Sequence, residues 1–331
     1  MDELVRRREY SAEKMNQLQR QLQTAKTLAE GKACVYATGS FGRGEAGEHS
    51  DLDIFIVGGS SKEKDGSEKR HLNRLDEICI KANLIETCRQ MEFPEFTGGG
   101  QYLVHYSIRD LAGTLGKPED DSTNTFTARL LLLLESQCLI GDVVYAQAIS
   151  DVVAAYWRDY EDHSENFTPA FVCNDILRLW RTFCVNYEAR TEREPEEKKA
   201  KGKIKNYKLK HSRLLTCYSG ILYLLVVHEL AGTVRPQDAI AMTRLTPTGR
   251  LDWLHKESSS ADARSNIDRL SAQYQKFLIE TNCPEAELIE RFQDKTQARE
   301  YLRQAGEFGD TVFAVLDSLG RSQKFHRLLV I

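Results

Sequence analysis

Two patterns of hydrophobic and polar positions divide the chain. Near the N-terminus, short apolar and β-branched runs, ACVYAT at residues 33–38 and DLDIFIV at residues 51–57, are typical of strands. A third strand-like piece, MEFPEFTGGGQYLVHYSI at residues 91–108, is interrupted by a proline and three glycines. From residue 108 onward the apolar spacing indicates helices almost throughout. The pattern predicts a strand-rich region followed by a long helical one.

Helical spacing is expected at the N-terminus as well. Residues 2–30 have a helix-forming composition and stop at Gly31, which suits a helix C-terminus. The polar segment at residues 58–69 predicts an exposed loop. Residues 68–90 return to helical spacing, with apolar residues near one stripe at Leu72, Leu75, Ile78 and Ile85. Further helices are expected at residues 108–115, 124–140, 142–162, 169–190, 203–231 and 236–243, and several after residue 259.

These elements predict an α/β (α+β) core with a mixed sheet, followed by an all-helical lobe. The expected divisions are an N-terminal helix packed on the core at residues 1–30, the core at residues 31–120, and a helical C-terminal lobe at residues 121–331. A chain of 331 residues is long enough to bury one large or two modest hydrophobic cores.

Composition narrows the setting without indicating a function. The chain has 45 Lys and Arg against 49 Asp and Glu, a net charge of -4, so any contact with nucleic acid requires a local basic patch. The eight cysteines form no C-x-x-C pair and are expected to be buried free thiols in a reducing cytosol. The charged N-terminus and the short apolar runs argue against a secretory signal and a membrane span, so a cytoplasmic location is expected.

The acid pair in the second strand, Asp51 and Asp53, is the first candidate for chemistry. Residues i and i+2 of a strand share a face, so the two carboxylates project together. Carboxylates this close repel each other unless a cation lies between them, and Mg²⁺ accepts carboxylate and phosphate oxygens. Upstream, Gly39 and Ser40 lie where a strand gives way to a short helix, a place suited to holding phosphate.

The combined pattern, Gly39, Ser40, Arg43 and Gly44 followed by Ser50, Asp51 and Asp53, resembles the signature of the DNA polymerase β-like nucleotidyltransferase superfamily. The resemblance implies transfer of a nucleoside monophosphate from a nucleoside triphosphate, or its deoxy form, to an acceptor hydroxyl, with release of pyrophosphate. Gly39, Ser40 and Arg43 would bind the nucleotide. Asp51, Asp53 and a third carboxylate would hold two Mg²⁺ (or Mn²⁺) ions. A polar turn with two surface aspartates is the simpler alternative.

The superfamily places its third carboxylate on a neighbouring strand. After Asp53, the strand-like acids before the helical region are Glu92 and Glu95, and Glu95 is favoured because it adjoins the glycine-rich turn. A solvated acid in an edge strand is the competing interpretation. Asp120 and Asp121 are further alternatives.

A basic segment, KIKNYKLKHSRLL at residues 203–215, is the second candidate. Lys205, Lys208, Ser212 and Arg213 lie at helical spacing, so several can share a face. Superfamily members with a helical second lobe, including cyclic-oligonucleotide synthases, supply Lys and Ser from such a helix to the β- and γ-phosphates. The resemblance therefore implies that Lys205, Lys208 and Ser212 bind nucleotide in a cleft between core and lobe. A plain basic helix is the alternative.

The wider layout, with FTARLLLLLESQCLIGD at residues 126–142, is similar to bacterial nucleotidyltransferases near the PII-uridylyltransferases. The expected acceptor is a nucleotide or oligonucleotide, as in signal synthesis or antiviral defence. Protein acceptors (AMPylation or uridylylation), an RNA 3′ end and small molecules stay open, as does a partner or effector protein. Two other classes are a non-catalytic nucleotide-binding module and a HEPN-type ribonuclease, the latter suggested by Arg158 and His163 in RDYEDH.

Overall fold

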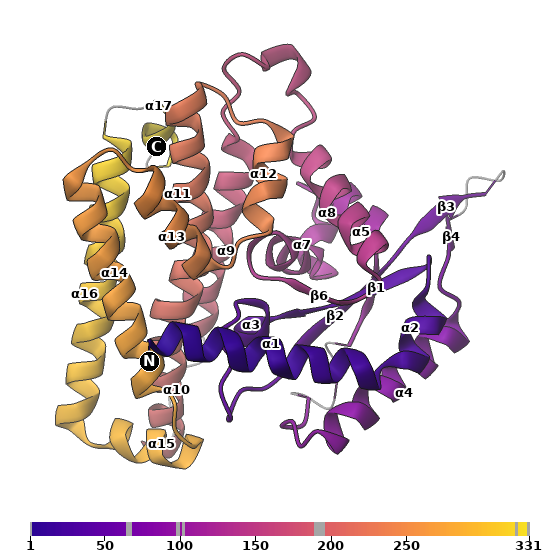
Figure 1. Cartoon of the computed structure of the whole chain (residues 1–331), viewed down its shortest axis with the longest axis horizontal. Coiled ribbons are helices and arrows are strands. Elements are labelled where there is room, and N and C mark those ends of the chain that lie inside the picture. Colours follow the sequence, from indigo (N-terminus) through magenta and orange to yellow (C-terminus); the bar gives the residue numbers. More distant parts are fainter. Residues whose placement is uncertain are drawn as a thin grey trace. The chain divides into compact units, whose positions relative to one another are not determined.

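The computed structural model describes residues 2–63, 68–96, 100, 103–188, 196–321 and 324–329. The chain forms two compact units, Met1–Arg158 and Asp159–Ile331. Every strand in the described part of the chain belongs to the first unit, and the second unit is helical where it is described (Figure 1).

A four-stranded mixed sheet organises the first unit. Its strands are β1 (Ala33–Thr38), β2 (Asp53–Gly58), β5 (His105–Ser107) and β6 (Gln137–Ile140), in the order β5-β2-β1-β6. β1 pairs antiparallel with β2 and with β6, and β5 runs parallel to β2. The register pairs Thr38, the last residue of β1, with Asp53, the first residue of β2. The chain after β1 therefore begins beside the acid pair.

Helices pack against both faces of this sheet. On one face, α1 (Glu3–Gln21), α2 (Gln23–Ala29) and α4 (Arg74–Gln90) contribute to the main hydrophobic core together with alternate residues of β1 and β2. On the other face, Tyr36 stacks on Phe55, with ring centroids 5.6 Å apart, and meets Tyr145 of α8 (Asp142–Tyr156). Two-sided cover explains why β1 is buried along its whole length.

The remaining elements of the first unit are short. A two-stranded hairpin projects away from the main sheet (Figure 1). The elements are β3 (Ser60–Lys62), β4 (Glu68–Arg70), α3 (Gly39–Gly42), α5 (Ile108–Gly113), α6 (Glu119–Ser122) and α7 (Thr125–Leu134).

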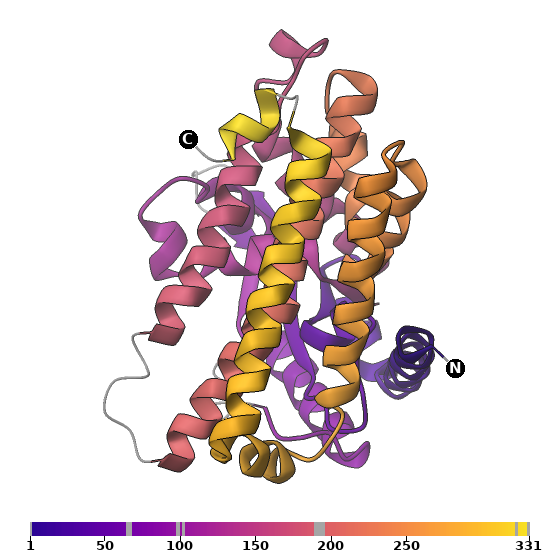
Figure 2. The same ribbon diagram turned by 90° about the vertical axis from the view of Figure 1, so that its left-hand side faces the viewer.

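The second unit is a helical bundle in which the long helix α16 runs beside α14 (Figure 2). Its centre holds the ring of His211, stacked on Phe277 at 4.5 Å between ring centroids and also in contact with Phe308 and Tyr207. Its elements are the 3₁₀ turn η2 (Glu161–His163), α9 (Ala170–Glu188), α10 (Glu196–Lys208), the π-helical turn η3 (Leu209–Arg213), α11 (Leu214–Ala231), α12 (Pro236–Thr243), α13 (Pro247–Glu257), α14 (Ala261–Glu280), α15 (Glu285–Gln293), α16 (Lys295–Gly320) and α17 (Lys324–Leu328).

One helical stretch of the described chain, Lys198–Ala231, passes a test of length and hydropathy for a membrane span, and 72% of its apolar window is buried within the protein. Burial of this kind is also typical of the central helix of a folded bundle.

The structure differs from the sequence-based expectations at several elements. Residues 91–96 are turn and irregular chain, and among the described residues of this region the strand is His105–Ser107. The expected helix at residues 124–140 ends at Leu134, and Gln137–Ile140 joins the sheet as β6. The first compact unit consequently extends to residue 158, whereas the sequence placed a division at residue 120.

The expected apolar stripe on the helix at residues 68–90 is also wrong in part. α4 begins only at Arg74, and it turns Ile80, Leu84 and Cys88 toward the core. Leu75 and Ile78 are instead 74% and 53% exposed. The cysteines are free thiols, as expected, but Cys79 on the same helix is exposed.

Candidate active site

The acid pair lies where β2 begins. Asp51 precedes the strand and Asp53 is its first residue, and both are exposed, while Leu52 and Ile54 between and after them are 4% exposed. This alternation confirms that the two carboxylates share a face. They emerge on the face that carries Phe55 farther along β2. An exposed carboxylate pair on a strand anchored by buried neighbours is well placed for ligand binding.

The turn after β1 brings Gly39 against Asp53. Gly39 opens α3 with a positive φ of 64°, which L side chains rarely adopt. A Cβ atom added to Gly39 would lie 2.6 Å from Asp53 Oδ2. Both the space available and the backbone conformation therefore require glycine at this position. Ser40 follows it and is half-buried. The structure therefore brings together four of the predicted site residues: Gly39, Ser40, Asp51 and Asp53.

Arg43 is placed differently from its predicted role. It is 7% exposed, and its guanidinium donates to Glu45 Oε2 at 2.8 Å and to Glu135 Oε2 at 2.9 Å. Glu135 Oε1 in turn accepts a hydrogen bond of 3.1 Å from the backbone N–H of Gly39. Because these groups are buried, Arg43 holds the turn in place from the protein interior. A phosphate ligand would instead be expected at an exposed position.

Two buried acids that hold this cluster, Glu45 and Glu135, were not predicted from the sequence. Glu135 lies 96 residues from Gly39 along the chain, so no local pattern predicts the contact. The sequence feature that could have indicated a buried Glu135 is its position as a single acid directly after the run of leucines that ends α7. An acid in such apolar surroundings is rarely buried unless it is paired.

The N-terminal helix supports the same turn. Arg7 of α1 is 6% exposed and donates to the backbone carbonyl of Glu45 at 3.1 Å. Ser11 Oγ accepts from the backbone N–H of Ala46 at 2.9 Å. Residues 45–46, between the glycine turn and the acid pair, are thus held by side chains of α1.

No strand supplies the third carboxylate in the part of the chain that the structure describes. β5, the strand beside β2, reads His105, Tyr106 and Ser107 and contains no acid. Glu92 and Glu95 are exposed and lie in irregular chain after α4, so their predicted strand position is wrong. The segment nevertheless approaches α3, because Phe93 packs edge-on against Phe41 with ring centroids 5.5 Å apart.

Asp120 is unsuited to metal binding. It is fully buried and receives two hydrogen bonds, of 2.9 and 2.6 Å, from the guanidinium of Arg129. Burial alone would raise the pKa of Asp120, but the hydrogen bonds and charge of Arg129 hold the pKa below its ordinary value. Asp120 is therefore a structural ion-pair partner, and its neighbour Asp121 lies exposed on α6.

A metal centre made only of protein side chains is not found among the described residues. They contain no group of three or more His, Cys, Asp or Glu side chains arranged to hold an ion. Asp51 and Asp53 supply two carboxylates of the type that Mg²⁺ prefers. The pair fits an ion that takes its other ligands from a phosphate-bearing substrate.

The basic segment belongs to the second unit. Lys205 and Lys208 are exposed on α10, as expected of a cationic face. Ser212 lies in the π-helical turn, is 9% exposed, and accepts a 3.4 Å hydrogen bond from Tyr274. The two lysines and the serine therefore differ in exposure, and the predicted cleft between core and lobe stays a prediction.

The HEPN-type motif does not lie on the helix that was expected at residues 142–162. α8 ends at Tyr156, Arg158 follows in a turn, and His163 lies exposed at the end of the 3₁₀ turn η2. Arg158 and His163 consequently do not lie on one helix.

Comparison with known families supports part of this picture. The family model of the nucleotidyltransferase domain matches residues 18–96, which run from the end of α1 through β1, α3, β2 and α4 to just past Glu95. A search of curated proteins found no significant match. The chain thus contains a segment similar to a nucleotidyltransferase domain, and this segment includes Gly39, Ser40, Asp51 and Asp53.

Proposed function

We propose that the protein is a metal-dependent nucleotidyltransferase that moves a nucleoside monophosphate from a nucleoside triphosphate to an acceptor hydroxyl. The observation that carries the proposal is the contact of the Asp53 carboxylate with Gly39, with Asp51 on the same face. This arrangement sets a carboxylate pair next to a glycine turn inside the segment that matches the nucleotidyltransferase domain.

Each group has a defined task in this reaction. Gly39, which has no Cβ, and Ser40 leave room for the triphosphate, and the Ser40 hydroxyl donates to a phosphate oxygen. Asp51 and Asp53 hold Mg²⁺ or Mn²⁺. When bound, the ions neutralise the triphosphate and favour ionisation of the acceptor hydroxyl. Arg43, Glu45 and Glu135 keep the turn in place from the buried side.

The bond changes follow an in-line displacement. The acceptor oxygen attacks the α-phosphorus, and the bond from that phosphorus to the bridging oxygen breaks. Pyrophosphate leaves with the bonding electrons, and the acceptor proton passes to a carboxylate or to water. Glu95 is our candidate for the nearby carboxylate, because its segment packs beside α3 through Phe93 and Phe41.

For the acceptor we propose a nucleotide or oligonucleotide hydroxyl, which corresponds to signal or oligonucleotide synthesis, with antiviral defence as one setting. Lys205 and Lys208 are proposed as further nucleotide contacts, in keeping with their exposure. A cytoplasmic location and a cognate partner protein stay predictions. Modification of a protein hydroxyl is the main alternative acceptor.

One observation favours a second candidate, a nucleotide-binding module without catalysis. β5 carries no acid, and the described chain has no cluster of three metal-binding side chains. Such a protein would keep the phosphate-binding turn and lack the group that accepts the acceptor's proton.

The test is incubation of purified protein with Mg²⁺ or Mn²⁺ and each α-³²P-labelled NTP and dNTP, with products separated by gel and thin-layer chromatography. The Asp51→Asn/Asp53→Asn variant should lose the labelled product, while the Asp159→Asn/Asp162→Asn variant, which changes two exposed acids elsewhere, should keep it. Parallel measurement of ATP binding separates the candidates. Binding without product, with every acceptor class supplied, would reject the transferase in favour of the binding module.

A further inference from the structure

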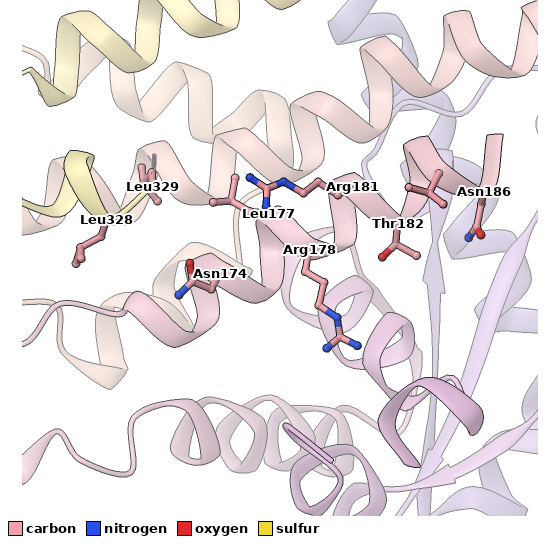
Figure 3. Close-up of a pocket in the computed structure, with 9 residues that line it drawn as sticks. Asn174, Leu177, Arg178, Arg181, Thr182, Asn186, Leu328 and Leu329 are labelled. Atoms are coloured by element: carbon pink, nitrogen blue, oxygen red, sulfur yellow. The ribbon is translucent and has the colours of Figure 1, made fainter. Parts of the chain in front are cut away.

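A pocket in the second unit lies along the outer face of α9. It has a volume of about 600 Å³ and is lined by α9 together with Leu328 and Leu329 at the end of α17 (Figure 3). α9 buries Val172, Ile176 and Leu179 on its inner side. The pocket-lining residues of α9 recur every three or four positions, so they form one continuous stripe on the helix.

The polar part of this stripe is rich in hydrogen-bonding groups. Asn174, Arg178, Arg181, Thr182 and Asn186 follow one another along the pocket (Figure 3). Asn174, Arg181 and Asn186 are exposed. From Asn174 to Asn186 the helix rises about 18 Å at 1.5 Å per residue. That length suits a chain of several linked units better than one compact ligand.

The pocket is cationic although the chain is not. Arg178 and Arg181 line it, and no acid is among the described lining residues. Asp175 lies 3.9 Å from Arg178, beyond hydrogen-bonding distance, and is itself 7% exposed. Lys324 and Arg327 of α17 are also exposed, but they do not line the pocket. This local positive charge contrasts with the net charge of -4 of the whole chain.

Apolar groups complete the lining. Leu177, Leu328 and Leu329 form part of the wall, and Val185 is 62% exposed within the stripe. Guanidinium groups bind phosphate in a bidentate manner and also stack on bases, whereas amide and hydroxyl groups both donate to and accept from base edges and ribose. Leucine and valine provide contact area for sugars and base faces. The combination matches a single-stranded oligonucleotide.

We infer that the pocket on α9 binds a single-stranded oligonucleotide, with Arg178 and Arg181 on its phosphates. This inference rests on the proposed nucleotidyl transfer: the acceptor would be an oligonucleotide that the helical unit binds. The binding itself does not require catalysis, so it can be measured separately. An acidic peptide is the competing ligand, since its carboxylates would also form ion pairs with the two arginines.

The test measures fluorescence anisotropy of fluorescein-labelled RNA and DNA strands of about twelve nucleotides, within the range of single-strand binding sites. The Arg178→Ala/Arg181→Ala variant should bind at least about tenfold more weakly, and the slope of log affinity against log salt should fall by about 1.4, or about 0.7 for each lost phosphate contact. The Arg269→Ala/Arg299→Ala variant removes two exposed arginines outside the pocket and should bind like the wild type.

A second variant guards against a folding defect. Val185→Glu places a negative charge in the pocket at an already exposed position and should weaken binding, whereas Val143→Glu, at a position 83% exposed outside the pocket, should not. Equal binding by pocket and control variants, or a polyglutamate peptide bound through the same arginines more tightly than either strand, would overturn the inference. The Asp51→Asn/Asp53→Asn variant should bind the strand normally, because its substitutions lie outside the pocket. Wild-type protein that binds the strand but transfers no nucleotide would reject the proposed function and leave this inference standing.

Discussion

The carboxylate of Asp53 lies so close to Gly39 that a Cβ atom on the glycine would stand 2.6 Å from Asp53 Oδ2. The antiparallel pairing of Thr38 with Asp53 creates this contact, because it sets the turn after β1 directly beside the start of β2. The glycine turn and the acid pair are therefore one structural unit. Any side chain at position 39 must displace the acid that we propose holds the metal.

Gly39→Ala should consequently reduce activity more than stability alone explains. The positive φ should cost about 1 kcal/mol in the free energy of unfolding, and the displaced Asp53 should lower kcat by about 100-fold or more. Gly31→Ala is the matched control, because Gly31 has a φ of 66° and no atom within 4 Å of an added Cβ. Urea unfolding and nucleotidyl-transfer rates would be compared. Similar activity in the two alanine variants would contradict the steric account.

Arg43 should behave as a structural residue. Arg43→Ala leaves the buried carboxylates of Glu45 and Glu135 without this cation, and removal of one partner from a buried ion pair typically costs about 3–5 kcal/mol. Urea unfolding should show a loss of this order. A large rise in KM for the nucleotide with unchanged unfolding would instead assign Arg43 to direct phosphate contact, as the sequence motif implies.

How far the sequence predicts this site depends on the distance over which each contact acts. Strands β1 and β2, the shared face of Asp51 and Asp53, and the glycine at position 39 follow from local spacing, and the structure reproduces them. Glu135 does not, since its contact with Gly39 spans 96 residues and depends on β6 joining the sheet after α7.

The errors in the expected elements have a similar origin. QCLI, residues 137–140, follows a run of leucines and has no periodicity of its own, so only its pairing with β1 makes it a strand. MEFPEF at residues 91–96 has the composition of a strand, but Glu92 adopts a positive φ of 59° and Pro94 lacks an N–H group. Packing of Phe93 on Phe41 then decides where this segment runs.

Glu95 should matter to catalysis if its segment places it beside the turn. Glu95→Gln keeps the shape of an exposed side chain and removes its charge, so stability should change little, while kcat should fall by roughly 100-fold for loss of a catalytic acid–base group. Glu92→Gln changes another exposed acid, three residues away, and should retain activity. Wild-type kcat in the Glu95→Gln enzyme would remove Glu95 from the site.

Stability of the helical unit should depend on pH through His211. Burial among aromatic rings lowers the pKa of His211 to about 4 from its ordinary value of 6.5, partly offset by a hydrogen bond to the backbone carbonyl of Tyr207. Between pH 6.5 and 4 the unfolded chain therefore binds a proton that the folded protein does not. Stability should fall by on the order of 3 kcal/mol as pH is lowered through this window, and change no further from this group below it.

His211→Phe supplies the comparison for that prediction. Phenylalanine resembles the neighbouring rings of Phe277 and Phe308 in size and does not titrate. The difference in unfolding free energy between wild type and variant, measured in urea from pH 7 to pH 4, should shift in favour of the variant as pH falls. A constant difference across this range would show that the imidazole ring has the same pKa in the folded and the unfolded protein, contrary to the lowered pKa.

Lys205 and Lys208 should act on nucleotide binding without affecting the fold. Both are exposed, so Lys205→Ala/Lys208→Ala should leave the unfolding free energy within about 0.5 kcal/mol and raise KM for the nucleoside triphosphate if the lysines reach its phosphates. Lys198→Ala/Lys199→Ala removes the same charge from the same helix and should leave KM unchanged. Ser212 provides the contrast within one segment, because its hydroxyl is buried against Tyr274 and its alanine variant should alter stability before KM. If Ser212→Ala raised KM at constant stability while the lysine pair did not, the phosphate-binding face would have to be reassigned from the exposed lysines to the π-helical turn.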